Sequence, residues 1–212
     1  MSDHVISISE PTLRRLPLYH QLLLREKQRG ASYVSCPKIA KKLEFSTIQV
    51  RKDLQAAGAT GRPRIGYVID EVLEVLADLL GYKNTKDALL IGAGNLGLAL
   101  LDYDGFSNHG LNIVAAFDID ESKIGKVING KRIYHLDKFS HIAKRLNIQI
   151  GIIATPVKAA IEASELMIKS EIKAIWNFAP IHLNTPEEIV VEDVNLSASF
   201  SVLSKKLKEK LN

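Results

Sequence analysis

The segment Leu89–Phe106, "LLIGAGNLGLALLDYDGF", decides how the C-terminal part of the chain folds. Its apolar run ends in a G-x-G-x-x-G pattern at Gly92, Gly94 and Gly97, and a helical stretch follows. In a βαβ unit the first glycine permits the turn and the second lets the backbone approach a pyrophosphate. The third lets the helix pack closely on the sheet. The segment therefore predicts a dinucleotide-binding loop that also contains Ala93, Asn95 and Leu96.

A second signal follows at the end of the next apolar segment, "NIVAAFDID". Asp118 lies 21 residues after Gly97, where a carboxylate is expected to accept hydrogen bonds from the adenosine ribose. Ile119 and Asp120 follow it in place of an arginine, and a second acid repels a 2′-phosphate. The sequence therefore favours NAD and NADH over their phosphorylated counterparts.

The alternation of strands and helices continues to the end of this region and predicts a Rossmann-type parallel sheet. "IQIGIIAT" and "IKAIWNFAP" are expected strands, and "LDKFSHIAKRL" and "PVKAAIEASELMIKS" are expected helices. Ligands of open α/β sheets bind at the carboxyl ends of strands. The residues expected at those ends are Thr155, Pro156, Asn177, Ala179 and Pro180, although each proline is also compatible with a plain strand terminus.

The N-terminal part of the chain is basic. Residues 1–66 contain 12 Lys and Arg against 5 Asp and Glu, whereas residues 67–212 contain 16 against 19. Such an asymmetry indicates a polyanionic partner for the basic part, with a solvated basic surface as the alternative.

Three helices are expected in this basic part, over 12–29, 35–43 and 47–57, and the last two resemble a helix-turn-helix. Pro37 suits the first helical position, and Ser46 or Thr47 caps the third helix. The following "GATGRPRIGYVI" is expected to form a β-hairpin wing, and the predicted fold is a winged helix. Residues with groups for DNA bases or phosphates are Lys38, Ser46, Thr47, Gln49, Arg51, Lys52, Arg62 and Arg64.

The C-terminal segment, "LSASFSVLSKKLKEKLN", predicts an amphipathic helix. Its apolar stripe can cover its own domain or exchange with a partner subunit, and two-fold dimers are usual among helix-turn-helix proteins. The expected organisation is a DNA-binding domain over 1–82, a nucleotide-binding domain over 83–195 and a dimerisation helix over 196–212. The residues expected at the dimer interface are Leu196, Phe200, Leu203 and Leu207.

Catalytic, metal and membrane functions have no support in the sequence. The six histidines have no metal-ligand spacing, and two Tyr-x-x-x-Lys matches, Tyr82/Lys86 and Tyr134/Lys138, lie at unsuitable positions for a short-chain dehydrogenase. No apolar run approaches 18 residues, the N-terminus lacks signal-peptide features, and the single Cys36 excludes an internal disulfide, so a cytoplasmic protein is expected. The alternatives are an NAD-dependent oxidoreductase with an appended regulatory domain, and a CoA- or nucleotide-binding module that acts through protein contacts.

The ordered set of motifs resembles the Rex family of redox-sensing transcriptional repressors. It runs from "TLRRLPLYHQLL" and "TIQVRKDLQAAG" through "IGAGNLGLALLDYDGF" and "FDIDESKIG" to "WNFAP" and the closing helix. The resemblance implies a winged helix that binds palindromic operator DNA and a Rossmann domain that binds NADH or NAD⁺. It further implies a homodimer held by swapped C-terminal helices, in which NADH releases the DNA.

The same resemblance implies roles for individual residues. Asp118, Ile119 and Lys123 would hold the adenosine end, Tyr103 would lie near the nicotinamide, and Arg15 would belong to the switch between modules. The chain departs from the family pattern at two places. Asn195 replaces a switch aspartate that exchanges partners with Arg15 and Tyr103, and the wing "GRPRIGY" inserts a proline and replaces a glycine with Arg64.

Overall fold

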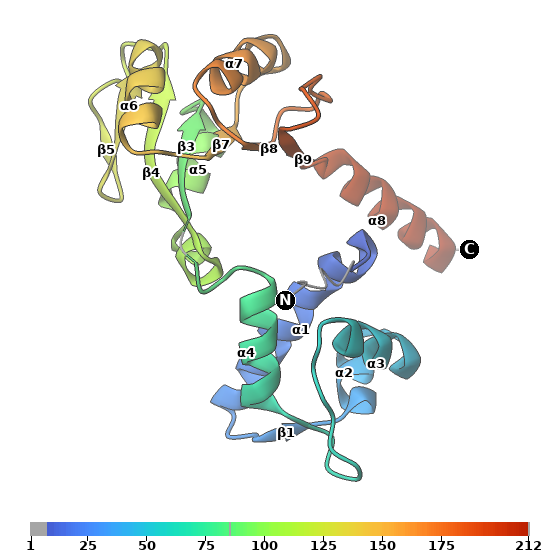
Figure 1. The fold of residues 1–212 in the computed structure, drawn as a ribbon. Coiled ribbons are helices and arrows are strands. Elements are labelled where there is room, and N and C mark those ends of the chain that lie inside the picture. Colours follow the sequence, from blue (N-terminus) through green and yellow to red (C-terminus); the bar gives the residue numbers. More distant parts are fainter. Residues whose placement is uncertain (1–7, 85, 212) are drawn as a thin grey trace. The chain divides into compact units, whose positions relative to one another are not determined.

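The computed structural model describes residues 8–84 and 86–211, and it divides the chain into two compact units, Met1–Asn84 and Thr85–Asn212 (Figure 1). Each unit has its own hydrophobic core. No helix among the described residues is long and apolar enough to cross a membrane.

The described residues of the first unit form four helices, three of which begin at a serine cap. α1 (Glu10–Gln28) begins after Ser9, and α2 (Cys36–Leu43) and α3 (Thr47–Ala56) begin after Ser35 and Ser46. Each of these serines accepts a hydrogen bond from a backbone N–H in the first turn, as N-cap residues do. α4 (Ile69–Leu79) completes the unit. α1 continues through Pro17, which lies inside the helix.

The wing is smaller than the expected β-hairpin. β2 (Tyr67–Val68) pairs antiparallel with β1 (Tyr33–Val34), which precedes α2, instead of with a strand of its own segment. The segment closes on itself only through one bridge between Arg62 and Gly66. Pro63 lacks a backbone donor, and the non-glycine Arg64 adopts a left-handed conformation with φ of 65°, so the segment forms a turn in place of a longer ladder.

The second unit is built on a seven-stranded sheet with the order β5-β6-β4-β3-β7-β8-β9. Its strands are β3 (Lys86–Ile91), β4 (Leu111–Asp118), β5 (Val127–Ile128), β6 (Lys131–His135), β7 (Ile150–Ile153), β8 (Ala174–Asn177) and β9 (Val190–Asp193). All pairs are parallel except β5 with β6. The Rossmann-type parallel sheet expected from the sequence is therefore confirmed.

Helices cover both faces of this sheet. α6 (Phe139–Arg145) and α7 (Val157–Lys169) pack with Phe117 and Ile153 on one face, whereas α5 (Asn95–Asp102) packs with Leu90 and Ile152 on the other. Two 3₁₀ turns, η1 (Asp104–His109) and η2 (Leu136–Lys138), complete these layers. The strand order places the start of α5 at the middle of the sheet, where connections leave to opposite sides and ligands bind in this architecture.

Three elements differ from the sequence-based expectation. The strand β6, which contains Tyr134, and the edge strands β5 and β9 were not expected. β5 has two residues, and β6 and β9 mix apolar with charged side chains, so their pattern does not stand out from that of loops. α8 (Leu196–Leu211) is present (Figure 1). The described side chains along it are exposed.

Candidate nucleotide-binding and DNA-binding sites

The glycine loop makes two backbone approaches that a side chain would prevent. Gly92 has φ of 101°, and a Cβ added there would lie 2.6 Å from the carbonyl oxygen of Ala154. A Cβ added at Gly97 would lie 1.8 Å from the carbonyl oxygen of Gly92. At Gly94 an added Cβ would meet no described atom within 4 Å. The first and third glycines therefore close the loop, and the second faces open space in which a ligand fits.

Asp118, the last residue of β4, is held from three sides. One carboxylate oxygen accepts hydrogen bonds from the backbone N–H of Ala93 (2.8 Å) and from Lys123 Nζ (3.1 Å). The other oxygen accepts from the N–H of Asp120 (2.9 Å). Burial raises the pKa of Asp118, but these hydrogen bonds outweigh it and lower the pKa below its ordinary value. The carboxylate is therefore ionised and fixed beside the glycine loop.

A pocket of about 320 Å³ opens between the glycine loop and the ends of β4 and β7. Its lining brings together seven of the expected cofactor residues, namely Gly92, Gly94, Asp118, Ile119, Lys123, Thr155 and Pro156. The hydroxyl oxygen of Thr155 is buried there without a hydrogen-bond partner among the described residues. An apolar wall, an acceptor carboxylate and an open glycine backbone fit the adenosine and phosphate parts of a dinucleotide.

The other lining residues of this pocket were not expected from the sequence as cofactor residues, and they include Leu136 and Glu162. Leu136 begins the turn after β6, and Glu162 lies in α7. Neither belongs to a motif, and only the pairing of β6 with β4 would have pointed to Leu136.

The other expected cofactor residues lie outside the pocket lining. Asn177 is completely buried and donates both amide hydrogens within the unit, to Ile181 O (2.7 Å) and Asp193 Oδ1 (2.8 Å). Its Oδ1 accepts from the N–H of Ala179, which is also buried, so these contacts hold the turn after β8. Pro180 is exposed, as are Asn95 and Leu96 at the start of α5, whereas Ala93 is buried.

Tyr103 lies at the C-terminal end of α5 and is 55% exposed. Its ring contacts Phe106 edge to face at 4.8 Å between centroids, and Phe106 in turn contacts Trp176. An aromatic row therefore extends from Tyr103 along the sheet face that carries α5.

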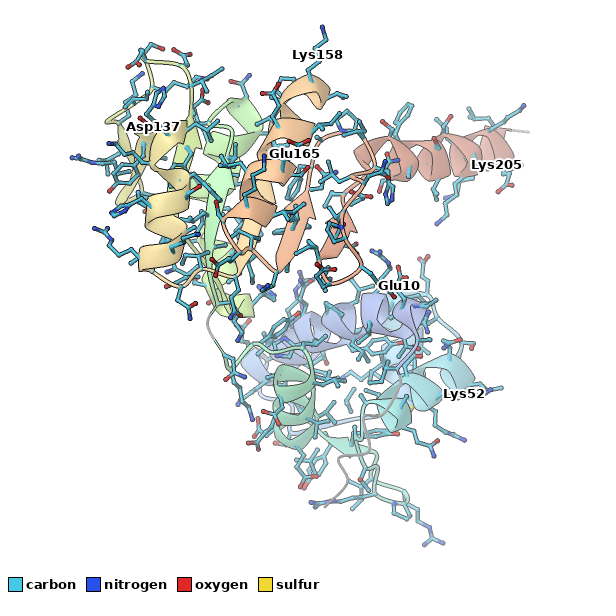
Figure 2. All side chains as sticks on the ribbon, turned by 45° about the horizontal axis from the view of Figure 1, so that its top comes forward. Glu10, Lys52, Asp137, Lys158, Glu165 and Lys205 are labelled. Atoms are coloured by element: carbon cyan, nitrogen blue, oxygen red, sulfur yellow. The ribbon has the colours of Figure 1, made fainter. Side chains whose placement is uncertain are left out.

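In the first unit, α3 has an inner and an outer face. Val50 and Leu54 are buried in the core, whereas Ile48, Arg51 and Lys52 are exposed. Figure 2 shows Lys52 extending away from the helix. Arg51 and Lys52 form no ion pair with another described residue, so both charges are available to a phosphate.

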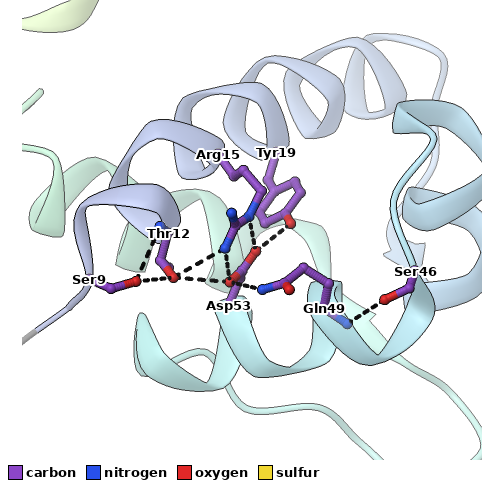
Figure 3. A network of polar contacts seen from close by, with 7 residues as sticks. All are labelled: Ser9, Thr12, Arg15, Tyr19, Ser46, Gln49 and Asp53. Carbon is purple, nitrogen blue, oxygen red and sulfur yellow. Dashed lines mark hydrogen bonds and ion pairs between the residues drawn. The ribbon is translucent and has the colours of Figure 1, made fainter.

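A buried polar network ties α3 to α1 (Figure 3). Asp53 accepts hydrogen bonds from Arg15 Nε (2.7 Å) and Nη2 (2.8 Å), from Tyr19 Oη (2.6 Å) and from Thr12 Oγ1 (3.2 Å). It also accepts from Gln49 Nε2 (2.8 Å). Burial raises the pKa of Asp53, but the hydrogen bonds outweigh it and lower the pKa to about 2. The network thus fixes the orientation of α3 on α1 with an ionised, buried carboxylate.

Several residues expected at the DNA have partners within the unit. Gln49 uses one amide hydrogen on Asp53, and Ser46 serves as the N-cap with Thr47 half-buried behind it. Lys38 forms an ion pair with the buried Glu26, at 2.5 Å, and Arg62 pairs with Glu71. The lysine and the arginine were expected as free cations, and the acids that hold them come from α1 and α4, which no local pattern connects to them.

A groove of about 320 Å³ lies between the start of α2 and the wing, with Arg51, Arg62 and Arg64 in its lining. Arg64 is exposed at the wing turn and forms no ion pair with another described residue. The groove therefore combines basic groups of α3 and of the wing on one basic surface.

Arg15 and Asn195 of the expected switch have hydrogen-bond partners within their own units, and the described side chains expected at the dimer interface are exposed. Arg15 has Asp53 as its partner, and Asn195 Oδ1 caps α8 by accepting from the N–H of Ala198 (3.0 Å). Along α8, Phe200, Leu203 and Leu207 are between 54% and 68% exposed, and the side chain of Leu196 lies outside the described residues. The described part of the chain contains no cluster of metal-ligating side chains.

Comparisons with known proteins cover nearly the whole chain. The family model described as "CoA binding domain" matches residues 83–181, and the model described as "Putative DNA-binding protein N-terminus" matches residues 7–55. The redox-sensing transcriptional repressor Rex of Bacteroides fragilis is 40% identical over 94% of this chain and 91% of its own length. The Rex repressor of Treponema denticola is 40% identical over 91% of this chain and 92% of its own.

Solved structures agree with these relatives. The structure of RSP, a Rex-family repressor, in complex with β-NAD⁺ and operator DNA matches with a TM-score of 0.89 and 32% identity, over 96% of this chain and 94% of RSP. RSP in complex with β-NADH matches with a TM-score of 0.87 over 96% and 95%. These relatives are named as repressors and not as enzymes. The chain belongs to the Rex family of redox-sensing transcriptional repressors.

Proposed function

We propose that this chain is a DNA-binding repressor whose affinity for operator DNA depends on whether NADH or NAD⁺ is bound. Residues 1–82 bind the operator, residues 83–195 bind the dinucleotide, and residues 196–212 hold a cytoplasmic homodimer through exchanged helices. The relatives are redox-sensing repressors by name, and RSP was solved in complex with β-NADH and with β-NAD⁺ and operator DNA.

The pocket beside Gly94 is the main support for the proposal that this chain binds a dinucleotide. It joins an open backbone with the fixed carboxylate of Asp118 and the hydroxyl of Thr155, which has no partner in the described part of the chain. Asp118 would accept from the adenosine ribose, and the start of α5 would face the pyrophosphate. Asp120, next to the same site, disfavours a 2′-phosphate.

Binding without turnover fits this site. A dehydrogenase needs a proton-transferring group over the nicotinamide and an anchor for its substrate. Besides Asp118, the ionisable groups in the described pocket lining are Lys123 and Glu162, and Lys123 is already paired with Asp118. The dinucleotide is therefore a signal in this proposal, and no catalytic residue is assigned.

The direction of the response follows from differential binding. A ligand shifts an equilibrium between two states only if it binds one of them better. NADH has an uncharged nicotinamide ring and NAD⁺ a cationic one, and a closed, dry pocket favours the uncharged ring. NADH therefore stabilises the closed form that has released DNA.

The test is fluorescence anisotropy of the full chain on a palindromic, AT-rich duplex, titrated with NADH and then with NAD⁺. Release by NADH but not by NAD⁺ supports the proposal, whereas equal responses to both would refute the redox-sensing part. Two variants separate the modules. Asp118→Ala should weaken nucleotide binding and leave DNA binding intact, and Arg51→Ala should do the reverse.

Two alternative functions predict different assay results. An NAD-dependent oxidoreductase would oxidise NADH steadily with a small carbonyl compound. A module that binds CoA, as the description of the matching family model suggests, would release heat with CoA in calorimetry and show no DNA affinity even at low salt, where phosphate contacts are strongest.

A further inference from the structure

Ile48 is the exposed apolar residue on the outer face of α3, and no motif singled it out. Its side chain is 67% exposed, although the same helix buries Val50 and Leu54 completely. Isolated exposed apolar residues are common on protein surfaces and need no explanation by themselves. The position of this residue and the charges beside it are what distinguish it.

Ile48 lies in the first turn of α3, two residues after the capping Ser46. In a helix-turn-helix, the first residues of the second helix contact base edges in the major groove. Positions three and four residues further along a helix share its face, and here they are Arg51 and Lys52. The isoleucine is therefore placed with two exposed cations on one strip of the helix, and that strip is complementary to the phosphates of DNA.

The network around Asp53 holds this strip in a fixed orientation. Asp53 faces inward from α3 and is bound by Arg15 and Tyr19 of α1. Gln49, the neighbour of Ile48 in the sequence, is turned toward the same carboxylate. At the start of α3 the exposed side chain is thus the apolar Ile48, whereas the amide of Gln49 donates one hydrogen bond to Asp53 inside the unit.

An apolar side chain in the major groove has one distinctive partner among the four base pairs. Thymine presents a 5-methyl group there, and cytosine, adenine and guanine present hydrogen-bonding groups without it. We propose that Ile48 is a specificity-determining residue that contacts the 5-methyl group of a thymine in each operator half-site. This inference rests on the proposed DNA-binding function and adds to it a named base feature.

The test compares thymine with deoxyuridine, which differ only by that methyl group. A palindromic duplex is first selected from a randomised library by the full chain with NAD⁺, and each symmetric pair of thymines is then replaced by deoxyuridine in turn. For the wild-type chain, one pair of replacements should weaken binding about fourfold per half-site, the value of one buried methyl-sized group. Across two half-sites the loss is roughly 15-fold.

The Ile48→Ala variant should bind the thymine and deoxyuridine duplexes equally and should retain the wild-type salt dependence, because no phosphate contact is removed. Two matched variants serve as controls. Ile65→Ala removes another exposed isoleucine of the unit, in the wing, and Thr47→Ser removes the neighbouring methyl group on α3. Both should keep the discrimination between thymine and deoxyuridine.

The outcomes separate this inference from the function on which it rests. If the wild-type chain binds every deoxyuridine duplex as tightly as the thymine duplex, Ile48 does not contact a methyl group and serves another partner, such as a protein surface. If discrimination persists in Ile48→Ala or disappears in Thr47→Ser, another residue makes the contact. If no duplex is bound at low salt, the DNA-binding function itself is refuted.

Discussion

The buried carboxylate of Asp53 gives the sharpest test of how the first unit is held together. Asp53 is 1% exposed and pairs with Arg15, whose side chain is 22% exposed. Asp53→Asn keeps the shape of the side chain but removes its charge and leaves Arg15 without a counterion. Losing one member of a buried pair costs about 3 to 5 kcal/mol, and the partial exposure of Arg15 favours the lower end, about 3 kcal/mol.

For a unit of this size each kcal/mol lowers the Tm by roughly 4 to 8 °C, so the expected loss is roughly 12 to 24 °C. The assay is differential scanning calorimetry of the full chain, in which NADH identifies the transition of the second unit by stabilising it. The matched control is Asp70→Asn, which breaks the exposed pair of Asp70 with Lys27. Such surface pairs contribute about 0 to 1 kcal/mol, so this variant should melt close to the wild type.

The dependence of the free energy of unfolding on acidic pH provides an independent check of the role of Asp53. The pKa of Asp53 is about 2 in the folded chain against an ordinary value of 3.8. The carboxylate therefore contributes stability that is present above pH 4 and is lost as the pH falls through about 2. That difference amounts to about 2 kcal/mol. Asp53→Asn should lack this part of the acid dependence. If Asp53→Asn melts within 4 °C of the wild type and loses as much stability at acidic pH as the wild type does, the assignment of Asp53 as an ionised anchor is refuted.

Three further changes test other parts of the molecule. Gly97→Ala puts a Cβ 1.8 Å from a carbonyl oxygen of the glycine loop, so NADH binding should be lost in calorimetry while DNA binding persists; unchanged NADH affinity would contradict the closed loop. Glu26→Gln removes the buried carboxylate that pairs with two lysines of α2, and the first unit should lose about 1 to 3 kcal/mol by thermal unfolding. Phe200→Asp places a charge on the apolar stripe of α8, and sedimentation should show monomers with an unchanged far-UV spectrum, whereas an intact dimer would refute the exchanged helix.

The sequence predicts the features that depend on local geometry. The glycine spacing, the cap at Ser46 and the apolar strand of Leu89–Ile91 each reflect constraints within a few residues, and the structure contains all of them. Asp118 was predicted because its distance from the glycine loop follows from the βαβ unit. Its pairing with Lys123 was not, because that contact depends on the turn after β4.

The features that escaped prediction depend on contacts between distant elements. Gln49 has the pattern of a base-reading residue, but it donates to Asp53 one turn further along α3, and that carboxylate is bound by Arg15 only after α1 packs on α3. Lys38 has the pattern of a free cation, yet Glu26 reaches it from 12 residues earlier in the chain. Hydrophobic periodicity defines which face of a helix is buried, but it contains no information about which polar groups meet across that face.

The anchoring of α3 also limits how a bound dinucleotide can control DNA binding. Coupling free energies between sites are typically about 1 to 3 kcal/mol. Detaching α3 from α1 would require breaking the Asp53 pair, at a cost of at least that size. We therefore expect the signal to move the first unit as a body, and so to change the separation of the two α3 helices in the proposed dimer, without rearranging the unit internally. Hydrogen exchange of the full chain should show equal protection of α3 with NADH and with NAD⁺. A selective loss of protection in α3 with NADH would show that the recognition helix itself is remodelled.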